Sequence, residues 1–152
     1  MDKTVIDTYV RMKQRYGNDI LVEVQVKKIV SQELMGTIQR LNDDETIHGI
    51  IIQLPLEDDS QTEAAVNAVS PKKDVDGLGD YGYFTPATPM AIDWLLVGYN
   101  IELNAKKIAI VGNGRLVGAP LSTLWQASGY DVTVFDDTSS DMDIKLRQFD
   151  VI

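Results

Sequence analysis

The stretch Lys107-Ile-Ala-Ile-Val-Gly-Asn-Gly-Arg-Leu-Val-Gly118 decides the fold of this chain. Its first five residues form a largely apolar run, which predicts a buried strand. Glycines then stand at positions 112, 114 and 118, and a helical pattern continues through Ser128. Such a turn suits a dinucleotide pyrophosphate, because glycines let the backbone approach it and the helix N-terminus supplies N–H donors. The stretch therefore predicts the strand, turn and helix of a dinucleotide-binding domain.

An acidic pair follows where such a domain needs one. A second predicted strand, residues 131–135, leads into Asp136 and Asp137. An acid about 20 residues beyond the glycines commonly binds the adenine ribose hydroxyls. The third glycine comes one residue later than in the common fingerprint, so a turn that serves packing alone remains the alternative. The candidate cofactor-binding residues are Thr88, Gly112, Asn113, Gly114, Arg115, Val117, Gly118, Asp136 and Asp137.

The acidic pair also bears on the choice of cofactor. Two carboxylates repel the extra phosphate of NADP, whereas one carboxylate accepts both ribose hydroxyls of NAD. We therefore expect NAD, with NADP as the alternative if Arg115 reaches that phosphate.

Outward from this stretch, helical and strand patterns alternate. Gly17 is expected to end the first helix, Ser31 to cap the second, and Thr88 to cap the fourth ahead of Pro89. We expect helices at residues 2–16, 31–41, 60–69, 88–98 and 118–128, strands at 20–26, 48–53, 107–111, 131–135 and 149–152, and an exposed loop at 74–86. This alternation predicts an α/β fold. Its parts are an N-terminal parallel-sheet catalytic domain (1–87) and an incomplete Rossmann-like domain (88–152).

The composition excludes several classes of function. The 152 residues include 23 acidic and 14 basic side chains, a net charge of −9, which disfavours nucleic acids and anionic membranes as partners. There is no cysteine and one histidine, His48, so we expect no metal site of the cysteine or multi-histidine kind. No apolar run is long enough to span a membrane, and the first residues do not form a signal peptide. The sequence predicts a cytoplasmic protein.

Three other stretches carry polar groups of interest. Tyr9 and Lys13, four residues apart, share one face of a predicted helix, where a lysine can serve as acid or base; the spacing alone favours a solvated lysine. Gln53 ends a predicted buried strand, where it is placed either to orient a ligand or to cap its own backbone. Asp74 and Asp76 lie in a glycine-containing turn, which is typical of solvent-facing carboxylates.

Taken in order, these stretches resemble one family. The family is that of the methylenetetrahydrofolate dehydrogenase/cyclohydrolases, and its motifs match this chain at Tyr9 and Lys13 and at residues 49–56, 73–77, 86–89 and 111–120. The resemblance covers nearly the whole chain. It implies NAD(P)-dependent oxidation of 5,10-methylenetetrahydrofolate to 5,10-methenyltetrahydrofolate, and hydrolysis of that product to 10-formyltetrahydrofolate.

The resemblance also implies roles for individual residues. Lys13 would be the catalytic acid/base, with Gln53 as its hydrogen-bonding partner and Tyr9 packed along the aminobenzoate part of the folate. Asp76 would bind the pterin. The folate-binding set would be Tyr9, Gln53, Leu54, Pro55 and Asp76, with Lys13, Gln53 and Tyr9 as the catalytic group. We expect folate as substrate and a homodimer as the assembly.

Several positions depart from the family pattern. Ile6 replaces a usual serine, Ala87 replaces a cysteine, Asn113-Gly114 replaces Arg-Ser, and the loop from residue 77 to 86 is shorter. The family also has a strand ahead of the tyrosine helix and several more strands beyond the position of Ile152. We therefore expect a fragment, or a reduced relative whose missing strands come from elsewhere, a partner subunit included.

Two other functions stay open at this point. One is a nucleotide- or folate-binding module without turnover, which the changed turn and the missing strands favour. The other is a different Rossmann-type oxidoreductase, which leaves Tyr9, Lys13 and Gln53 unexplained.

Overall fold

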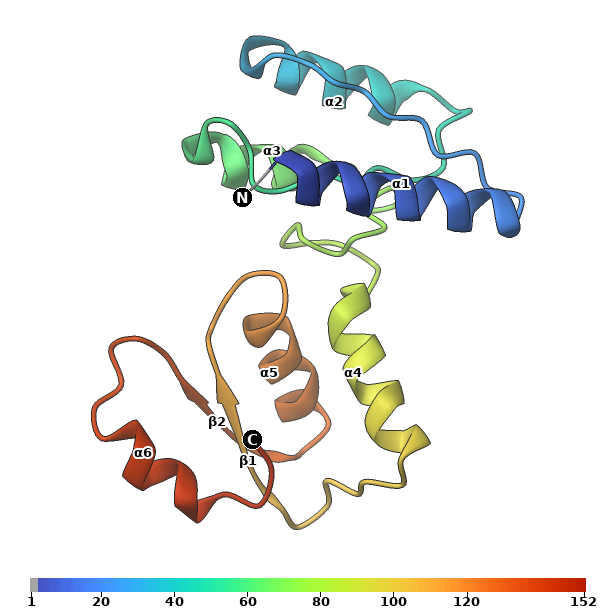
Figure 1. The fold of residues 1–152 in the computed structure, drawn as a ribbon. Coiled ribbons are helices and arrows are strands. Elements are labelled where there is room, and N and C mark those ends of the chain that lie inside the picture. The colour runs from blue at the N-terminus through green and yellow to red at the C-terminus, as the bar shows by residue number, and fades with distance from the viewer. Residues whose placement is uncertain (1–2) are drawn as a thin grey trace. The chain divides into compact units, whose positions relative to one another are not determined.

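The computed structural model describes residues 3–152, which divide into two compact units (Figure 1). One unit ends at Lys73 and the other spans Asp74–Ile152. The first contains α1 (Lys3–Asp19), a 3-10 turn (Ser31–Glu33), α2 (Leu34–Asp43), a second 3-10 turn (Asp59–Gln61) and α3 (Thr62–Ala68). Among the described residues, no helix has the length and apolar character needed to span a bilayer.

The core of the first unit joins α2 and α3. Its buried side chains are Leu34, Ile38, Ile50, Ala65 and Val69. Asn42 fastens the ends of the two helices, because its Nδ2 donates to Ala68 O at 2.7 Å and its Oδ1 accepts from Ser70 N at 2.8 Å. This polar link fixes the register of the two helices at one end.

Lys73 caps the C-terminus of α2. Its Nζ donates to the carbonyl oxygens of Leu41, Asn42 and Asp44, at 2.9, 2.7 and 2.8 Å. The last carbonyls of a helix have no donor within the helix, and a cation there is favoured by the helix dipole. Lys73 O in turn accepts from Ile50 N at 2.7 Å. Lys73 thus connects α2 to the segment that leads to Gln53.

The two strands predicted in the first unit, residues 20–26 and 48–53, are wrong. A strand exists through its hydrogen-bonded neighbour, and in the described part of this unit neither segment has a continuous one; Ile50 N makes a single bond to Lys73 O. The two segments do alternate apolar and polar residues or hold an apolar run, but they lack a neighbouring strand to pair with in the described part of this unit. The predicted α/β class holds because of the second unit.

Residues after α1 fold back onto that helix instead of forming a strand. Val22 N donates to Gly17 O at 2.8 Å, and Gln14 Nε2 donates to Val24 O at 3.4 Å. A Cβ at Gly17 would lie 2.6 Å from Val22 O. Glycine is therefore needed for close approach of the backbone, and the prediction that Gly17 ends the helix is wrong: α1 continues to Asp19.

Two predicted helix caps are also wrong. Ser31 lies inside the 3-10 turn that precedes α2, where Val30 occupies the cap position. Helix α4 (Ala87–Gly98) is preceded by Pro86, so Thr88 and Pro89 are its second and third residues. Proline is tolerated in a first turn, because the N–H that it lacks would have no partner within the helix. The predicted end of α4 at Gly98 is confirmed.

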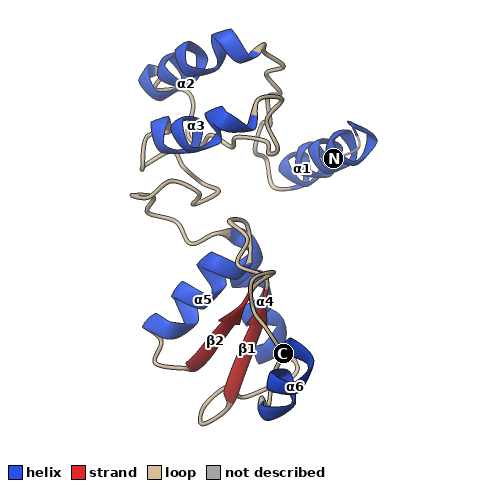
Figure 2. Cartoon of the chain, turned by 90° about the vertical axis from the view of Figure 1, so that its left-hand side faces the viewer, coloured by secondary structure: helices blue, strands red, loops and turns tan. Residues whose placement is uncertain are grey.

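The second unit holds a parallel pair of strands between helices. After α4 come β1 (Lys107–Val111), α5 (Gly118–Ala127), β2 (Asp131–Phe135), α6 (Met142–Lys145) and a 3-10 turn (Leu146–Gln148). Strands β1 and β2 pair in parallel from Lys107 beside Asp131 to Val111 beside Phe135, as the sequence predicted. Figures 1 and 2 place α5 on one face of the pair and α6 on the other. Leu103, Ile108, Ile110, Leu121 and Trp125 form the core.

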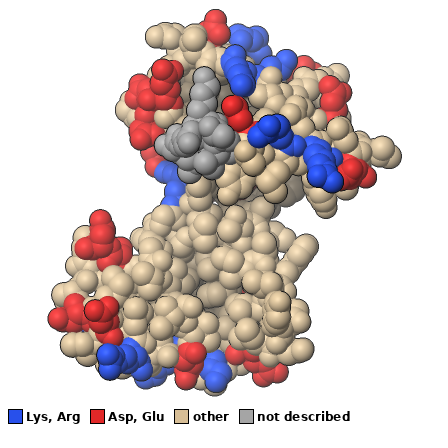
Figure 3. Space-filling view, viewed as in Figure 1, with Lys and Arg blue, Asp and Glu red and all other residues tan. Residues whose placement is uncertain are grey.

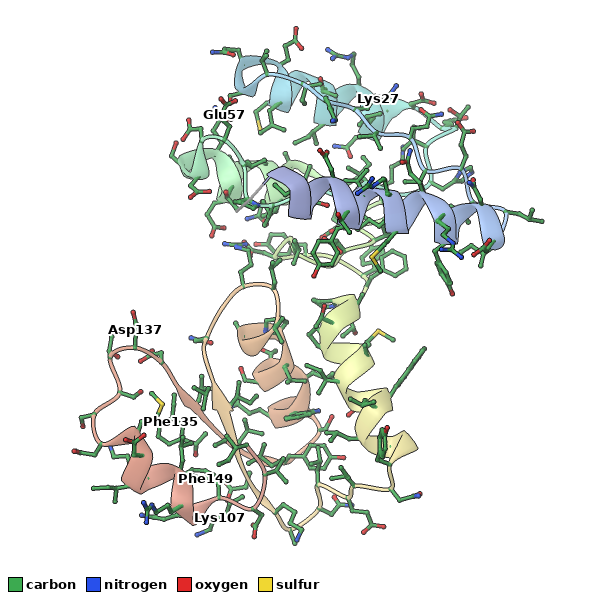
Figure 4. All side chains as sticks on the ribbon, viewed as in Figure 1. Lys27, Glu57, Lys107, Phe135, Asp137 and Phe149 are labelled. Atoms are coloured by element: carbon green, nitrogen blue, oxygen red, sulfur yellow. The ribbon has the colours of Figure 1, made fainter. Side chains whose placement is uncertain are left out.

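The end of the chain lies along the free edge of β1. A single parallel bridge joins Ile108 to Val151, with Ala109 N donating to Val151 O at 2.9 Å, so the predicted strand at 149–152 is reduced to one bridge. Phe149 packs edge-on against Phe135, with ring centroids 5.5 Å apart (Figure 4). Strand β1 therefore lies between β2 and this final segment.

Candidate active site

The structure brings Lys13 and Gln53 together within the first unit. Lys13, on α1, donates from Nζ to Gln53 Oε1 at 3.3 Å across 40 residues of sequence. Both side chains are half-buried. The amide of Gln53 is held at its other end, because its Nε2 donates to Leu54 O at 3.1 Å. This second bond keeps Oε1 directed at the lysine.

The partner of Lys13 is a neutral amide rather than a carboxylate. A carboxylate would hold the ammonium in its charged form by direct attraction, whereas an amide oxygen orients Nζ without adding a charge. A lysine serves as general base only when it is neutral, and it can then give the proton back as an acid. The hydrogen bond therefore orients Lys13 Nζ and places no opposite charge beside it.

The neighbouring candidates are more open to solvent. Tyr9 lies one turn before Lys13 on α1, on the same helix face, and is 55% exposed. Its ring is thus available to a flat ligand. Leu54 and Pro55 follow Gln53 and are joined by a cis peptide bond. Leu54 is half-buried and Pro55 is exposed.

Asp74, in the second unit, contradicts the expectation of a solvent-facing carboxylate. It is 4% exposed. Its Oδ1 accepts from Gly77 N at 3.0 Å and Leu78 N at 3.4 Å, and its Oδ2 accepts from Gly79 N at 2.8 Å. The sequence signal for this burial was the pair of glycines three and five residues on. Asp76 stands inside the turn that these bonds close, and it is half-buried.

The glycine-rich turn combines tight packing with open backbone. A Cβ at Gly118 would lie 1.8 Å from Gly112 O, so only glycine lets α5 begin so close to the end of β1. A Cβ at Gly112 or Gly114 would meet nothing within 4 Å, and Gly112 has a φ of 103°. Gly112 N donates to Phe135 O at 2.7 Å, which fixes the turn beside the end of β2. The turn therefore presents bare backbone at the carboxyl edge of the sheet, which suits a pyrophosphate.

Asn113, Arg115 and Val117 lie within this turn, and Val117 occupies the cap position of α5. Arg115 also borders a groove of about 550 Å³ that is lined by residues of the 77–86 loop and by α5. Thr88 is exposed in the first turn of α4. The structure thus gathers most of the predicted cofactor residues at the β1–α5 turn and places Thr88 on a separate helix.

The two acids after β2 have different surroundings. Asp136 Oδ1 accepts from Thr138 Oγ1 at 2.6 Å, Thr138 N at 3.0 Å and Ser139 Oγ at 3.2 Å. The Thr138 hydroxyl, followed by the Thr138 N–H, lowers the pKa of Asp136 below its ordinary value. Asp137 is exposed and projects from the loop (Figure 4). Asp136 therefore stays ionised while it orders the loop, and Asp137 is open to a ligand.

The face of the molecule in Figure 3 shows no wide basic area. In the second unit, the charged side chains on this face gather around α6 and the lower border, and the surface over α4 and α5 is mostly uncharged. In the first unit, acidic and basic side chains alternate. This face offers no broad positive surface to a phosphate backbone.

Two family models divide the chain between them. The model described as tetrahydrofolate dehydrogenase/cyclohydrolase, catalytic domain, matches residues 2–76, and the model of the NAD(P)-binding domain of the same enzymes matches residues 86–152. The chain belongs to the tetrahydrofolate dehydrogenase/cyclohydrolase family. The family resemblance and the order of its two parts, catalytic before NAD(P)-binding, are thereby confirmed.

Relatives in this family agree in sequence and in fold. The bifunctional protein FolD of Helicobacter pylori strain J99 is 35% identical over 158 residues, covering 95% of this chain and 54% of the relative. The crystal structure of the FolD enzyme of Campylobacter jejuni superposes with a TM-score of 0.88 at 30% identity, covering all of this chain and 60% of that one. The Trypanosoma brucei FolD, solved with NADP and an inhibitor, gives 0.87 at 27% identity, covering 99% and 57%. The chain spans about half the length of the curated family members it matches.

Proposed function

We propose that this chain carries the chemistry of its family: NAD(P)-dependent oxidation of 5,10-methylenetetrahydrofolate to the methenyl form, and hydrolysis of that product to 10-formyltetrahydrofolate. The observation that carries the proposal is the 3.3 Å hydrogen bond from Lys13 Nζ to Gln53 Oε1. Of the three functions left open by the sequence, this one uses the pair, whereas a different Rossmann-type oxidoreductase has no need of it.

Lys13 is proposed as the acid/base. In the hydrolysis, water adds to the methenyl carbon and loses a proton, which Lys13 Nζ in its neutral form is placed to receive. The bond between that carbon and N5 then breaks, and the protonated lysine returns the proton to N5, which leaves the formyl group on N10. Because the bond to Gln53 uses only one N–H of Nζ, the rest of the nitrogen is left for the substrate. Gln53 is proposed to orient Lys13, and Tyr9 to stack on the aminobenzoate part of the folate. Asp76 is proposed as the pterin ligand, with Leu54 and Pro55 beside the folate.

We place the functional boundary between residues 87 and 88. This proposal is supported by the family models, of which the catalytic one ends at residue 76 and the NAD(P)-binding one begins at residue 86. The division by contacts falls earlier, after Lys73, because the 74–86 segment packs with the second unit.

For the dinucleotide, which serves the reaction as hydride acceptor, we propose NAD over NADP. The residues that would hold it are Gly112 and Gly114, whose backbone is open, with Asn113, Arg115, Val117, Gly118 and Thr88 around them. Asp136 and Asp137 would meet the adenine ribose. The two adjacent carboxylates support this choice, because negative charge repels the extra phosphate of NADP. The Trypanosoma brucei relative was solved with NADP. We therefore base the preference for NAD on the residues of this chain and not on the cofactor of a relative.

Calorimetric titration of NAD and NADP, at low and at high salt, tests the choice of cofactor. We expect tighter binding of NAD, with a difference that shrinks as salt screens the charges. Equal affinities, or tighter NADP at low salt, would show that the acids after β2 do not face the ribose.

We also propose that the chain acts in the cytoplasm as a homodimer. Support for a second copy comes from α4, whose Trp94, Leu95 and Val97 are 70%, 58% and 68% exposed. Apolar groups gathered on one helix commonly mark an interface. Light scattering at several concentrations measures the assembly, and a mass that stays monomeric would refute this part.

The assignment of Lys13 is tested with the variant Lys13→Met. We expect the methenyl hydrolysis rate to fall about a hundred- to ten-thousand-fold, the usual worth of general acid–base catalysis. Dinucleotide affinity should not change, because the glycine-rich turn belongs to the other unit. Arg15→Met, at an exposed position of the same helix, is the matched control and should keep the wild-type rate. If Lys13→Met keeps more than half of an established wild-type rate, the assignment fails. A wild-type chain that binds the folate without turnover would leave a binding module in place of an enzyme.

A further inference from the structure

We propose that Asp74 is a positioning residue: its buried carboxylate closes the loop that carries Asp76 and so sets the group that binds the pterin. The part of this inference that concerns the pterin rests on the proposed function.

Both oxygens of Asp74 are committed to the backbone. Oδ1 accepts from Gly77 N and Leu78 N, and Oδ2 accepts from Gly79 N, the shortest of the three bonds at 2.8 Å. A carboxylate that is 4% exposed is costly unless donors surround it, and these N–H groups provide them. Asp74 therefore acts as the centre around which residues 77–79 fold.

The loop wraps closely around this centre on its return. A Cβ at Gly82 would lie 3.0 Å from Asp74 Oδ2, and a Cβ at Gly77, which has a φ of 64°, would lie 2.3 Å from Phe84 O. Only glycine fits at Gly77 without a shift of backbone. The carboxylate is thus enclosed by both the outgoing and the returning parts of the loop.

Asp76 lies inside the ring that Asp74 closes. Gly77 N donates both to Asp74 O, at 3.2 Å, and to Asp74 Oδ1, so residues 75 and 76 are held between two fixed points. The direction of the Asp76 side chain follows from that backbone. Asp74 itself is enclosed by the loop, whereas Asp76 is half-buried. The two acids of the motif therefore have different roles: Asp74 shapes the loop and Asp76 faces the ligand.

The test replaces one oxygen of Asp74 with a donor. In Asp74→Asn, the amide oxygen keeps the bonds to Gly77 and Leu78, while the new NH₂ group opposes Gly79 N–H. Loss of a charge-assisted bond corresponds to about a tenfold effect or more. We expect the Gly79 amide to exchange with solvent at least about tenfold faster, and the Kd for tetrahydrofolate to rise about tenfold, with no change in the Kd for NAD.

The matched control is Asp58→Asn. Asp58 also uses its carboxylate to cap backbone, accepting from Ser60 N at 3.0 Å and Ser60 Oγ at 2.6 Å, but it lies in the first unit. Asp58→Asn likewise removes the charge of a capping carboxylate, but it does so outside the loop, so its Kd for tetrahydrofolate should stay at the wild-type value. If Asp74→Asn fails to fold, Gly82→Ala crowds the same oxygen from outside and should weaken tetrahydrofolate in the same direction.

A double-mutant cycle shows whether Asp74 works through Asp76. In an Asp76→Asn background, the further change Asp74→Asn should alter the Kd for tetrahydrofolate by less than about twofold, because residues that act as one unit are not additive. A full tenfold effect in that background would overturn the inference. A purely structural role would weaken both backgrounds equally.

The outcomes separate the two proposals. Unchanged exchange at Gly77 to Gly79 in Asp74→Asn would overturn the loop-closing role. Faster exchange, with a Kd for tetrahydrofolate no different from that of Asp58→Asn, would overturn the positioning role and leave the proposed function intact. A wild-type chain that binds no tetrahydrofolate would overturn the proposed function together with the pterin part of this inference, while the exchange rates still decide whether Asp74 closes the loop.

Discussion

The variant Lys73→Met should weaken the first unit at the end of α2. Methionine keeps most of the aliphatic length of lysine and removes the ammonium, so packing along the side chain changes little. Three carbonyl oxygens, those of Leu41, Asn42 and Asp44, lose their donor together. They stand at the C-terminus of a helix, where the dipole also favours a cation.

The size of the effect follows from the surroundings of each bond. The bonds to Leu41 O and Asn42 O are partly buried, and hydrogen bonds to a charged group contribute about 1.5–3 kcal/mol net in favourable cases. The bond to Asp44 O is exposed, and exposed charges contribute little because water competes with them. Discounting all three for partial exposure gives about 2 kcal/mol of local stability. That loss corresponds to about a thirtyfold increase in the open population of α2.

Amide hydrogen exchange over residues 34–43 measures this change directly. Lys72→Met is the matched control, because Lys72 is the exposed neighbour of Lys73 and its loss should leave exchange unchanged. Both tryptophans, Trp94 and Trp125, belong to the second unit, so their fluorescence during urea unfolding reports on that unit alone. We expect that transition to be the same in all three proteins. If α2 exchanges equally fast in the Lys73 and Lys72 variants, the capping interpretation is wrong.

Two further predictions concern the carboxyl edge of the sheet. Gly118→Ala should destabilise the second unit by about 1–3 kcal/mol, as overpacking usually does, and should weaken dinucleotide binding. Gly98→Ala, at a site where a Cβ meets nothing within 4 Å, should do neither. Tryptophan fluorescence in urea measures the stability and calorimetry measures the binding; equal results for the two variants would contradict the prediction. Thr138→Val should raise the pKa of Asp136 toward its ordinary value, because the Thr138 hydroxyl is the main cause of its lowering. In the wild type the lowered pKa stabilises the folded state above about pH 4, and this stability is lost as the pH falls through the folded-state pKa. An NMR titration of the Asp136 carboxyl that is identical in the wild type and in Thr138→Val would contradict the role of the Thr138 hydroxyl.

The second unit was predictable because its signals are local. The apolar run of β1, the glycines after it and the run of β2 lie within 30 residues, and each constrains its neighbour. The strands predicted in the first unit failed for the opposite reason. An alternating pattern shows which side chains can share a face, but it does not show whether another strand is present to pair with.

The site was only partly visible from local spacing. Tyr9 and Lys13 share a helix face, which alone favoured a solvated lysine, and the contact with Gln53 spans 40 residues that no local pattern measures. Burial of Asp74 depends on backbone N–H groups that arrive three to five residues later, so its side chain looked like an ordinary turn carboxylate. What the sequence lacked in both cases was the position of the partner.

The unequal packing of the glycines in the β1–α5 turn also constrains how this gene can drift. Every single-base change in a glycine codon that yields another amino acid introduces a Cβ. At Gly118 that atom would fall 1.8 Å from a backbone oxygen, whereas at Gly114 it would meet nothing within 4 Å. Gly114 and Gly118 belong to the same motif, but selection for a folded protein acts on them differently. In a randomly mutagenised library sorted only for folded protein, codon 114 should accumulate substitutions and codon 118 should remain almost silent.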